Sequence, residues 1–207
     1  MGLIKKFFAQ TRKPEGFLGS LMLSGMNLGH ARGADWALDF LKDVSPSSIV
    51  DLGCGGGRNV KETLSRYPDA KVAAVDYSAL SVERTRKKNA RAVASGRLSV
   101  WQEDVAELPF GVRTFDLATA FETVYFWPDL EKCFSEVRRV LTPGGYFLIF
   151  NESDGVDEVG RNFEKIIDGM KCYTAEELTA ALTSAGFSDV RIERRENKPW
   201  LAVIARK

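Results

Sequence analysis

A short apolar segment that runs directly into a glycine cluster constrains the fold of this chain more than any other feature. The segment covers residues 48–52, glycines occupy positions 53 and 55–57, and a helix-like stretch begins at Arg58. A strand, a glycine loop and a helix in this order are typical of doubly wound α/β sheets, in which ligands bind beyond the carboxyl ends of the first strands. Glycines there let a ligand approach the backbone closely. We therefore expect a nucleotide-like ligand at this loop.

Two common nucleotide-binding loops do not fit these glycines. A dinucleotide fingerprint needs glycine at the sixth position, but that position is Arg58 when counted from Gly53 and Val60 when counted from Gly55. A phosphate-binding P-loop needs a lysine after its last glycine, and none stands there. Dinucleotides and nucleoside triphosphates are therefore disfavoured as ligands.

From residue 48 onward, short β-branched and apolar runs alternate with amphipathic stretches. This pattern predicts parallel strands joined by crossover helices. The five expected strands cover residues 48–52, 71–76, 97–101, 115–120 and 145–150. The sequence thus predicts a doubly wound, mostly parallel α/β sheet.

The last third of the chain predicts a helix followed by an antiparallel hairpin. Thr174 and Glu177 have the spacing of a capping box that begins a helix, and Gly186 ends it. Two strand-like runs follow at 189–194 and 199–205, and the four residues between them are too few for a parallel crossover. The expected sheet therefore has seven strands. Residues 16–40 are predicted to form helices that lie over the strand ends as a lid.

Composition narrows the class of partner. The chain has 29 Lys and Arg against 28 Asp and Glu, so its charge of +1 does not favour nucleic acid. Its three cysteines are scattered and odd in number, which favours a reducing cytoplasm. No apolar run has the roughly 20 residues that cross a bilayer. We expect a small-molecule substrate, no nucleic acid and no membrane span, and the composition leaves the oligomeric state open.

Four segments, in order, resemble class I S-adenosylmethionine-dependent methyltransferases. The loop Asp51-x-Gly53-x-Gly55-x-Gly57 is similar to the D-x-G-x-G-x-G loop of that family, and a second strand ends in Asp76 about 25 residues later. The segments at 101–110 and 114–122 follow, and then the helix, Pro-Gly-Gly turn and strand of residues 134–150. The resemblance, which is to small-molecule methyltransferases of type 11, implies a Rossmann-like methyltransferase fold. It also implies methyl transfer from S-adenosylmethionine, with S-adenosylhomocysteine as product.

The resemblance implies a cofactor site along the first three strands. Asp76 would accept hydrogen bonds from both ribose hydroxyls, because a carboxylate accepts such bonds strongly, although a helix N-cap is its alternative role. Asp104 would receive the adenine amino group, and Val105 would add a backbone contact. The predicted cofactor-binding residues are Asp51, Gly53, Cys54, Gly55, Gly57, Asn59, Asp76, Tyr77, Ser78, Asp104, Val105 and Phe121.

The acceptor side is expected after the fourth and fifth strands. Aligning an acceptor with the methyl carbon contributes roughly 7 to 11 kcal/mol, so no metal is required. If the acceptor carries a proton, Glu122 is the first candidate base, and Tyr125 and His30 are further candidates. Glu122 could equally bind near the cofactor or at a helix end. The predicted substrate contacts are Trp36, Phe126, Trp127, Asn151 and Glu152.

We expect one domain over residues 1–207. It would consist of an N-terminal helical lid at 1–43, a cofactor-binding core at 44–150, and a substrate-side insert, helix and hairpin at 151–207. Two other hypotheses stay open. The chain could bind S-adenosylmethionine or S-adenosylhomocysteine without catalysis, or it could be a nicotinamide-dependent oxidoreductase, which the residue at position 58 disfavours.

Overall fold

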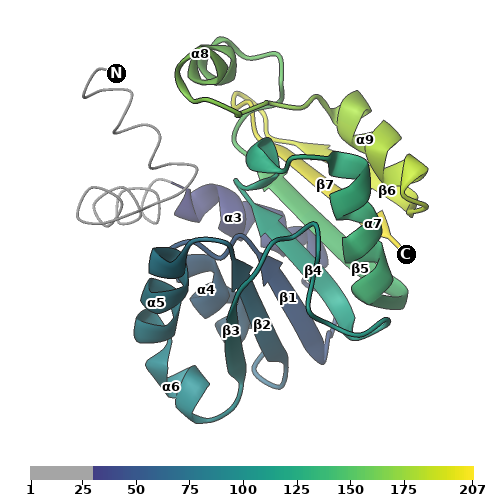
Figure 1. Cartoon of the computed structure of the whole chain (residues 1–207). Coiled ribbons are helices and arrows are strands. Elements are labelled where there is room, and N and C mark those ends of the chain that lie inside the picture. Colours follow the sequence, from purple (N-terminus) through teal and green to yellow (C-terminus); the bar gives the residue numbers. More distant parts are fainter. Residues whose placement is uncertain (1–29) are drawn as a thin grey trace.

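The computed structural model of this protein describes residues 30–207 (Figure 1). The predictions for residues 1–29, which include most of the expected lid, lie outside the described residues. The described part contains one seven-stranded sheet with the order β3-β2-β1-β4-β5-β7-β6. The strands are β1 (Ser48–Leu52), β2 (Lys71–Asp76), β3 (Leu98–Gln102), β4 (Phe115–Phe121), β5 (Leu141–Asn151), β6 (Ser188–Arg194) and β7 (Leu201–Arg206).

The topology confirms the predicted fold class. Strands β1 to β5 pair in parallel, whereas β7 pairs antiparallel with both β5 and β6. The central strands are buried on both faces, as parallel strands covered by crossover helices must be. The carboxyl ends of the parallel strands therefore meet at one edge of the molecule.

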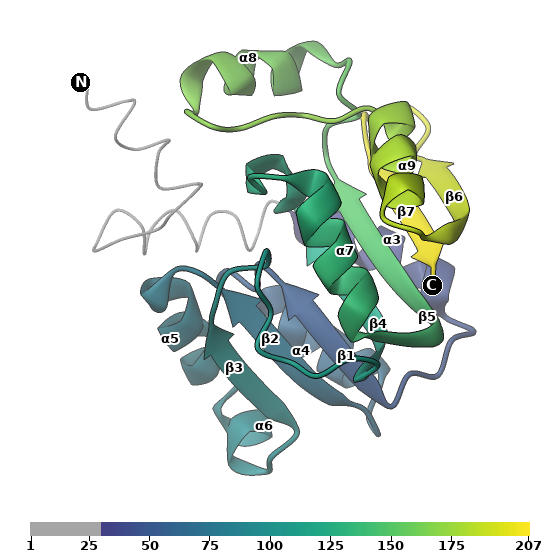
Figure 2. The same cartoon turned by 45° about the vertical axis from the view of Figure 1, so that its right-hand side comes forward.

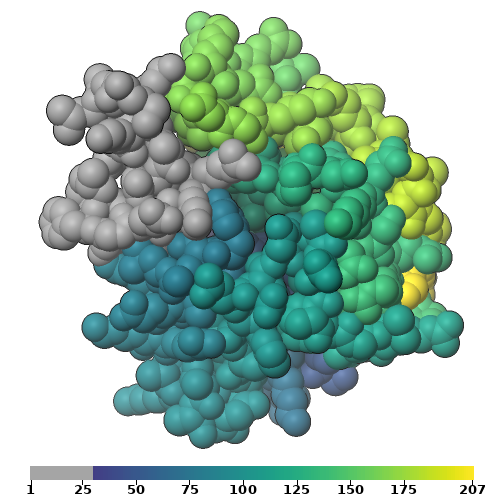
Figure 3. All heavy atoms as spheres, viewed as in Figure 1, coloured from purple at the N-terminus to yellow at the C-terminus, as the bar shows by residue number. Residues whose placement is uncertain are grey.

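Helices cover both faces of this sheet (Figures 1 and 2). One buried cluster joins a sheet face to α7 and α9, and a second joins the opposite face to α3, α4 and α5. With all heavy atoms drawn in the same view, the segments of the described part pack closely against one another (Figure 3). The helices are α3 (Ala31–Leu38), α4 (Arg58–Arg66), α5 (Ala79–Lys88), α6 (Ala90–Ala94), α7 (Leu130–Val140), α8 (Glu158–Ile166) and α9 (Ala175–Ser184), with 3-10 turns η1 (Asp39–Leu41) and η2 (Val124–Phe126).

Strand boundaries differ from the predicted ones mainly in β5. This strand begins at Leu141. The Pro-Gly-Gly segment, which was expected to form a turn before the strand, is an irregular part of the strand itself. The register between β4 and β5 shifts between Phe115 and Leu117 at this point. A Cβ on Gly145 would lie 3.1 Å from the carbonyl oxygen of Asp116. A larger residue would therefore crowd the neighbouring strand.

The described part of the expected lid packs on the sheet face instead. In α3, Ala34, Ala37 and Leu38 are fully buried. A Cβ on Gly33 would lie 2.2 Å from the ring of Phe150, so the helix backbone rests directly on β5. We therefore correct the lid prediction for residues 31–38, which form a layer of the core because their apolar face is small enough for close packing.

The predicted capping box at the start of α9 is confirmed. Thr174 and Glu177 satisfy each other's backbone N–H groups, as the spacing predicted. α8, by contrast, lies apart from the two helix layers, beyond the end of β5 (Figures 1 and 2). Among the helices of residues 30–207, none is both long enough and apolar enough to cross a membrane.

Candidate functional site

The glycine loop between β1 and α4 is held from several sides. The N–H groups of Gly53 and Cys54 donate to the carbonyl oxygen of Val75 over 2.8 and 3.0 Å. Gly53 has a φ of +81°, and a Cβ there would lie 2.3 Å from Oγ1 of Thr123. Glycine is therefore required at this position both by backbone conformation and by close approach.

Asp76 joins the end of β2 to the glycine loop. Its Oδ2 accepts a hydrogen bond from the N–H of Gly55 over 2.8 Å, and its Oδ1 accepts one from the N–H of Ser78 over 2.9 Å. Burial raises the pKa of this carboxyl group. The side chain of Ser81 also interacts with this carboxylate, and because each carboxylate oxygen accepts about two hydrogen bonds, the group keeps acceptor capacity for a ligand. The helix cap of α5 is Ser78, which leaves Asp76 available for a ligand.

Asp51 ends up inside the sheet, only 2% exposed. It lies opposite Thr119 of β4, whose Oγ1 donates to Oδ1 of Asp51 over 2.7 Å. Burial raises the pKa of Asp51 to about 7, and the hydrogen bond from Thr119 opposes that shift. The first acid of the glycine-loop motif is therefore anchored by the core.

The other predicted cofactor residues differ in exposure. Tyr77 is 40% exposed beside Asp76, whereas Cys54 and Phe121 are buried. The side chain of Asp104 is exposed, and its Oδ1 accepts a hydrogen bond from the backbone N–H of Ala106 over 2.8 Å. Val105 packs against the core, and Asn59 accepts a hydrogen bond from Arg58 over 3.2 Å.

A second group of polar residues stands where β4 and β5 end. Glu122 follows β4 directly and has a φ of +60°, a conformation that non-glycine residues seldom adopt. Its Oε1 accepts the backbone N–H of Glu152, and its carboxylate also hydrogen-bonds the hydroxyl of Tyr125. Desolvation raises the pKa of Glu122 to about 8, the charge of His30 opposes that shift, and the charge of Glu152 adds to it.

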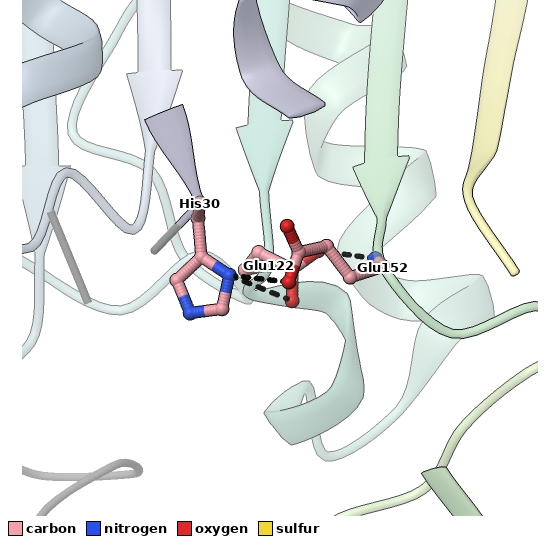
Figure 4. A group of neighbouring side chains, drawn as sticks. All are labelled: His30, Glu122 and Glu152. Atoms are coloured by element: carbon pink, nitrogen blue, oxygen red, sulfur yellow. Dashed lines mark hydrogen bonds and ion pairs between the residues drawn. The ribbon is translucent and has the colours of Figure 1, made fainter. Parts of the chain in front are cut away.

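His30 completes this group from the start of α3 (Figure 4). Its Nδ1 lies 2.9 Å from Oε2 of Glu152 and 3.9 Å from Oε2 of Glu122. Burial lowers the pKa of His30, but the hydrogen bond to Glu152 and the two carboxylate charges outweigh burial and raise the pKa above its usual value. The three side chains come from three separate segments of the chain, with His30 and Glu152 122 residues apart, and they meet at the carboxyl edge of the sheet.

Two predicted substrate contacts lie in the core instead. Trp36 packs against Phe40, Phe150 and Trp200, with ring centroids 5.0 to 6.1 Å apart. Trp127 is 7% exposed and stacks on Phe147. Both rings are therefore engaged in aromatic packing within the described part of the chain.

The remaining predicted acceptor-side residues lie near the end of β5. The buried hydroxyl of Tyr125 accepts the N–H of Ser153 over 3.1 Å, and Phe126 follows it in η2. Asn151 is fully buried, and its amide has no hydrogen-bond partner among the described residues. The sequence pattern placed Glu122 and Glu152 in this region, but it did not predict that both face His30. Pairing of Phe121 with Phe150 is the signal that brings the two glutamates together.

Comparison with known proteins finds similarity to methyltransferases. Residues 50–149 match a protein family whose description is "Methyltransferase domain". The methyltransferase phqN of Penicillium fellutanum is 29% identical over 165 residues, which cover 73% of this chain and 50% of that protein. The chain therefore spans about half the length of the curated relatives it matches.

Solved structures share the fold. A putative methyltransferase of Haloferax volcanii, in complex with the Trm112 methyltransferase activator, aligns with a TM-score of 0.81 and 19% identity, covering 97% of both chains. Human N-acetylserotonin methyltransferase in complex with SAM aligns with a TM-score of 0.72 and 19% identity, covering 90% of this chain and 55% of that one.

Proposed function

We propose that this chain is a class I S-adenosylmethionine-dependent methyltransferase that methylates a small-molecule acceptor, which its similarity to methyltransferases supports. The observation that carries this proposal is the position of two polar groups at the same edge of the sheet. One is the glycine loop with Asp76, and the other consists of Glu122, Glu152 and His30. The first suits the cofactor and the second suits the acceptor.

The residues of the first group fit an adenosyl ligand. Asp76 is fixed by two backbone N–H groups and keeps acceptor capacity on its carboxylate, which suits the ribose hydroxyls. The exposed carboxylate of Asp104 suits an adenine amino group. Tyr77 and Asn59 border the same strand ends, and Asp51 supports the loop from the core. We also assign the other predicted cofactor residues to the cofactor site: Gly53, Cys54, Gly55, Gly57, Ser78, Val105 and Phe121.

Bound here, S-adenosylmethionine would supply a methyl carbon attached to a positively charged sulfur. The chain's own task is to align the acceptor with that carbon and to exclude water. The acceptor's nucleophilic atom gains the methyl group and gives up its proton. We assign the receipt of that proton to Glu122 and His30, with the hydroxyl of Tyr125 fixing the Glu122 carboxylate. Phe126 and Glu152 would contact the acceptor, whereas the fully buried Asn151 would reach it only after movement of the residues that cover it.

Calorimetric titration of the purified protein tests the cofactor before an acceptor is known. We expect saturable binding of S-adenosylmethionine and S-adenosylhomocysteine and no binding of NAD. Binding of NAD alone would instead support the oxidoreductase hypothesis. If none of the three ligands binds, the proposal is refuted.

A second experiment separates catalysis from binding alone. Transfer of radiolabelled methyl to a panel of hydroxyl, amine and thiol compounds should identify an acceptor, and Glu122→Gln should slow the transfer without loss of cofactor affinity. A protein that binds the cofactor tightly but methylates nothing in the panel would support the non-catalytic hypothesis.

The cellular setting is also part of the proposal. Cys54, Cys133 and Cys172 are buried free thiols, which supports a protein that works in a reducing cytoplasm. We infer that the chain acts as a single domain on a soluble small molecule. A thiol count on protein purified without reductant checks the redox state, since a reducing compartment predicts three free cysteines.

A further inference from the structure

Three side chains at the strand ends offer ligand atoms that lie within 4.8 Å of one another: one nitrogen of His30 and one oxygen each of Glu122 and Glu152 (Figure 4). We propose that they form a binding site for a divalent transition-metal cation, such as Zn²⁺ or Mn²⁺. The methyltransferase chemistry proposed above does not require this site.

The distances suit a common centre. Ligands about 2.1 Å from a cation lie about 3.0 to 3.4 Å from each other when neighbouring and about 4.2 Å apart when opposite. Nδ1 of His30 is 2.9 Å from Oε2 of Glu152 and 3.9 Å from Oε2 of Glu122. A cation could therefore enter with only small movements of these side chains.

The orientation of the ligands is already fixed by a second set of contacts. Oε1 of Glu122 is engaged by the backbone N–H of Glu152 and the carboxylate by the hydroxyl of Tyr125, so Oε2 is the atom that faces His30. His30 stands at the start of α3, and Asp35 of this helix accepts hydrogen bonds from the two terminal guanidinium nitrogens of Arg58 over 2.6 Å. Such outer contacts are typical of metal sites because they hold ligands in a productive geometry.

The charge and the donor types favour a transition metal. Once deprotonated, the two carboxylates and the imidazole carry two negative charges, which a divalent cation neutralises, so binding would displace the protons that the raised pKa values of Glu122 and His30 favour. A nitrogen ligand disfavours Mg²⁺, which prefers oxygen, and suits the first-row transition metals. In the metal-free protein, the proton that His30 shares with Glu152 occupies the same place.

The location would also give the cation a role. Three protein ligands leave open positions for water or for an oxygen or nitrogen of the acceptor, and a coordinated hydroxyl loses its proton more readily. This consequence, unlike the cation binding itself, rests on the proposed function.

Calorimetry on the chelator-treated full chain, without cofactor or acceptor, tests the site. We expect one Zn²⁺ or Mn²⁺ per chain, with Mg²⁺ bound at least about tenfold more weakly. Glu122→Gln and Glu152→Gln should each weaken binding about tenfold or more. The matched control is Glu131→Gln, an exposed position on α7, which removes the same charge and should leave the affinity unchanged.

Absorption spectroscopy with Co²⁺ adds a readout that general charge effects would not move. The visible bands of bound Co²⁺ should change in His30→Gln, because a nitrogen ligand is lost, and should stay unchanged in Glu131→Gln. Lack of saturable binding would overturn the proposal, as would equal binding by wild type and both glutamine variants, or an equal loss in the control. Cofactor titration of the same protein remains a separate result, so failure of the cation site leaves the proposed function standing.

Discussion

Asp51 lies at the end of β1 with its carboxyl group almost fully removed from water. Its pKa rises from 3.8 to about 7 because burial disfavours the charged form. Between these two values the folded protein keeps a proton that the unfolded chain releases. The stability contributed by the protonated group is therefore lost as the pH rises from about 4 to about 7.

Asp51→Asn should remove this pH dependence. The amide oxygen can still accept the hydrogen bond from Thr119, while the ionisable group is gone. We expect the variant to be more stable than the parent at pH 8, by on the order of 2 kcal/mol, and similar to it at pH 4. Chemical denaturation across this range measures the difference. A parent protein whose stability stays flat between pH 4 and 7 would contradict the raised pKa.

Substitution of Asp76 should change the affinity for the ligand. Asp76→Ala removes the acceptor for Gly55 and Ser78 as well as the proposed acceptor for the ribose hydroxyls. Binding of S-adenosylhomocysteine should weaken by roughly 1 to 3 kcal/mol, which is about five- to a hundredfold. Asp76→Asn, which keeps one acceptor oxygen, should lose less. Equal affinity of wild type and Asp76→Ala in calorimetry would refute the assignment.

The helix α3 depends on contacts that no local pattern reveals. Strands were predictable because runs such as Lys71–Asp76 carry their own apolar pattern, and the capping box of α9 is contained in four residues. By contrast, Gly33 packs on Phe150, more than a hundred positions away. The prediction of a lid over the strand ends failed for this segment because its partner is fixed only by the tertiary fold.

The ion pair between Arg58 and Asp35 ties α3 to α4 and should control the local stability of α3. The two side chains are 21% and 35% exposed, so the pair is only partly screened by water. Arg58→Ala should cost about 1 kcal/mol and raise amide hydrogen exchange in α3 about fivefold, with β1 and β4 unchanged.

The control for this prediction is Arg58→Lys, which keeps the charge but not the two parallel hydrogen bonds. It should fall between wild type and alanine. Exchange that rises equally in α3 and in the central strands would mean that the substitution weakens the whole fold, and the local role of the ion pair would be refuted.

At the scale of the whole molecule, the site is a product of topology. Glu122 and Glu152 follow neighbouring parallel strands, so knowledge of the strand order alone would bring them together. His30 precedes the first strand and reaches them only because α3 crosses the sheet face next to β5. The cofactor-side predictions therefore rest on local motifs after consecutive strands, whereas the meeting of His30 with the two glutamates depends on the tertiary fold.

A ligand that contacts the loops after β1, β2 and β3 together requires the folded sheet and should stabilise the whole molecule. At a concentration of S-adenosylhomocysteine one hundred times its Kd, binding adds about 2.7 kcal/mol. For a chain of 207 residues this corresponds to a rise in Tm of roughly 5 to 10 °C. NAD at the same concentration should leave the Tm unchanged in a thermal melt.

The same melt on Asp76→Ala connects this global effect to the site. If the variant binds a hundredfold more weakly, the ligand concentration equals its Kd, and the stabilisation falls to about 0.4 kcal/mol, or about 1 °C. A full thermal shift in this variant would place the ligand away from the end of β2. A shift with NAD but not with S-adenosylhomocysteine would mean that the sheet edge holds a dinucleotide, despite Arg58 at the sixth position of the glycine loop.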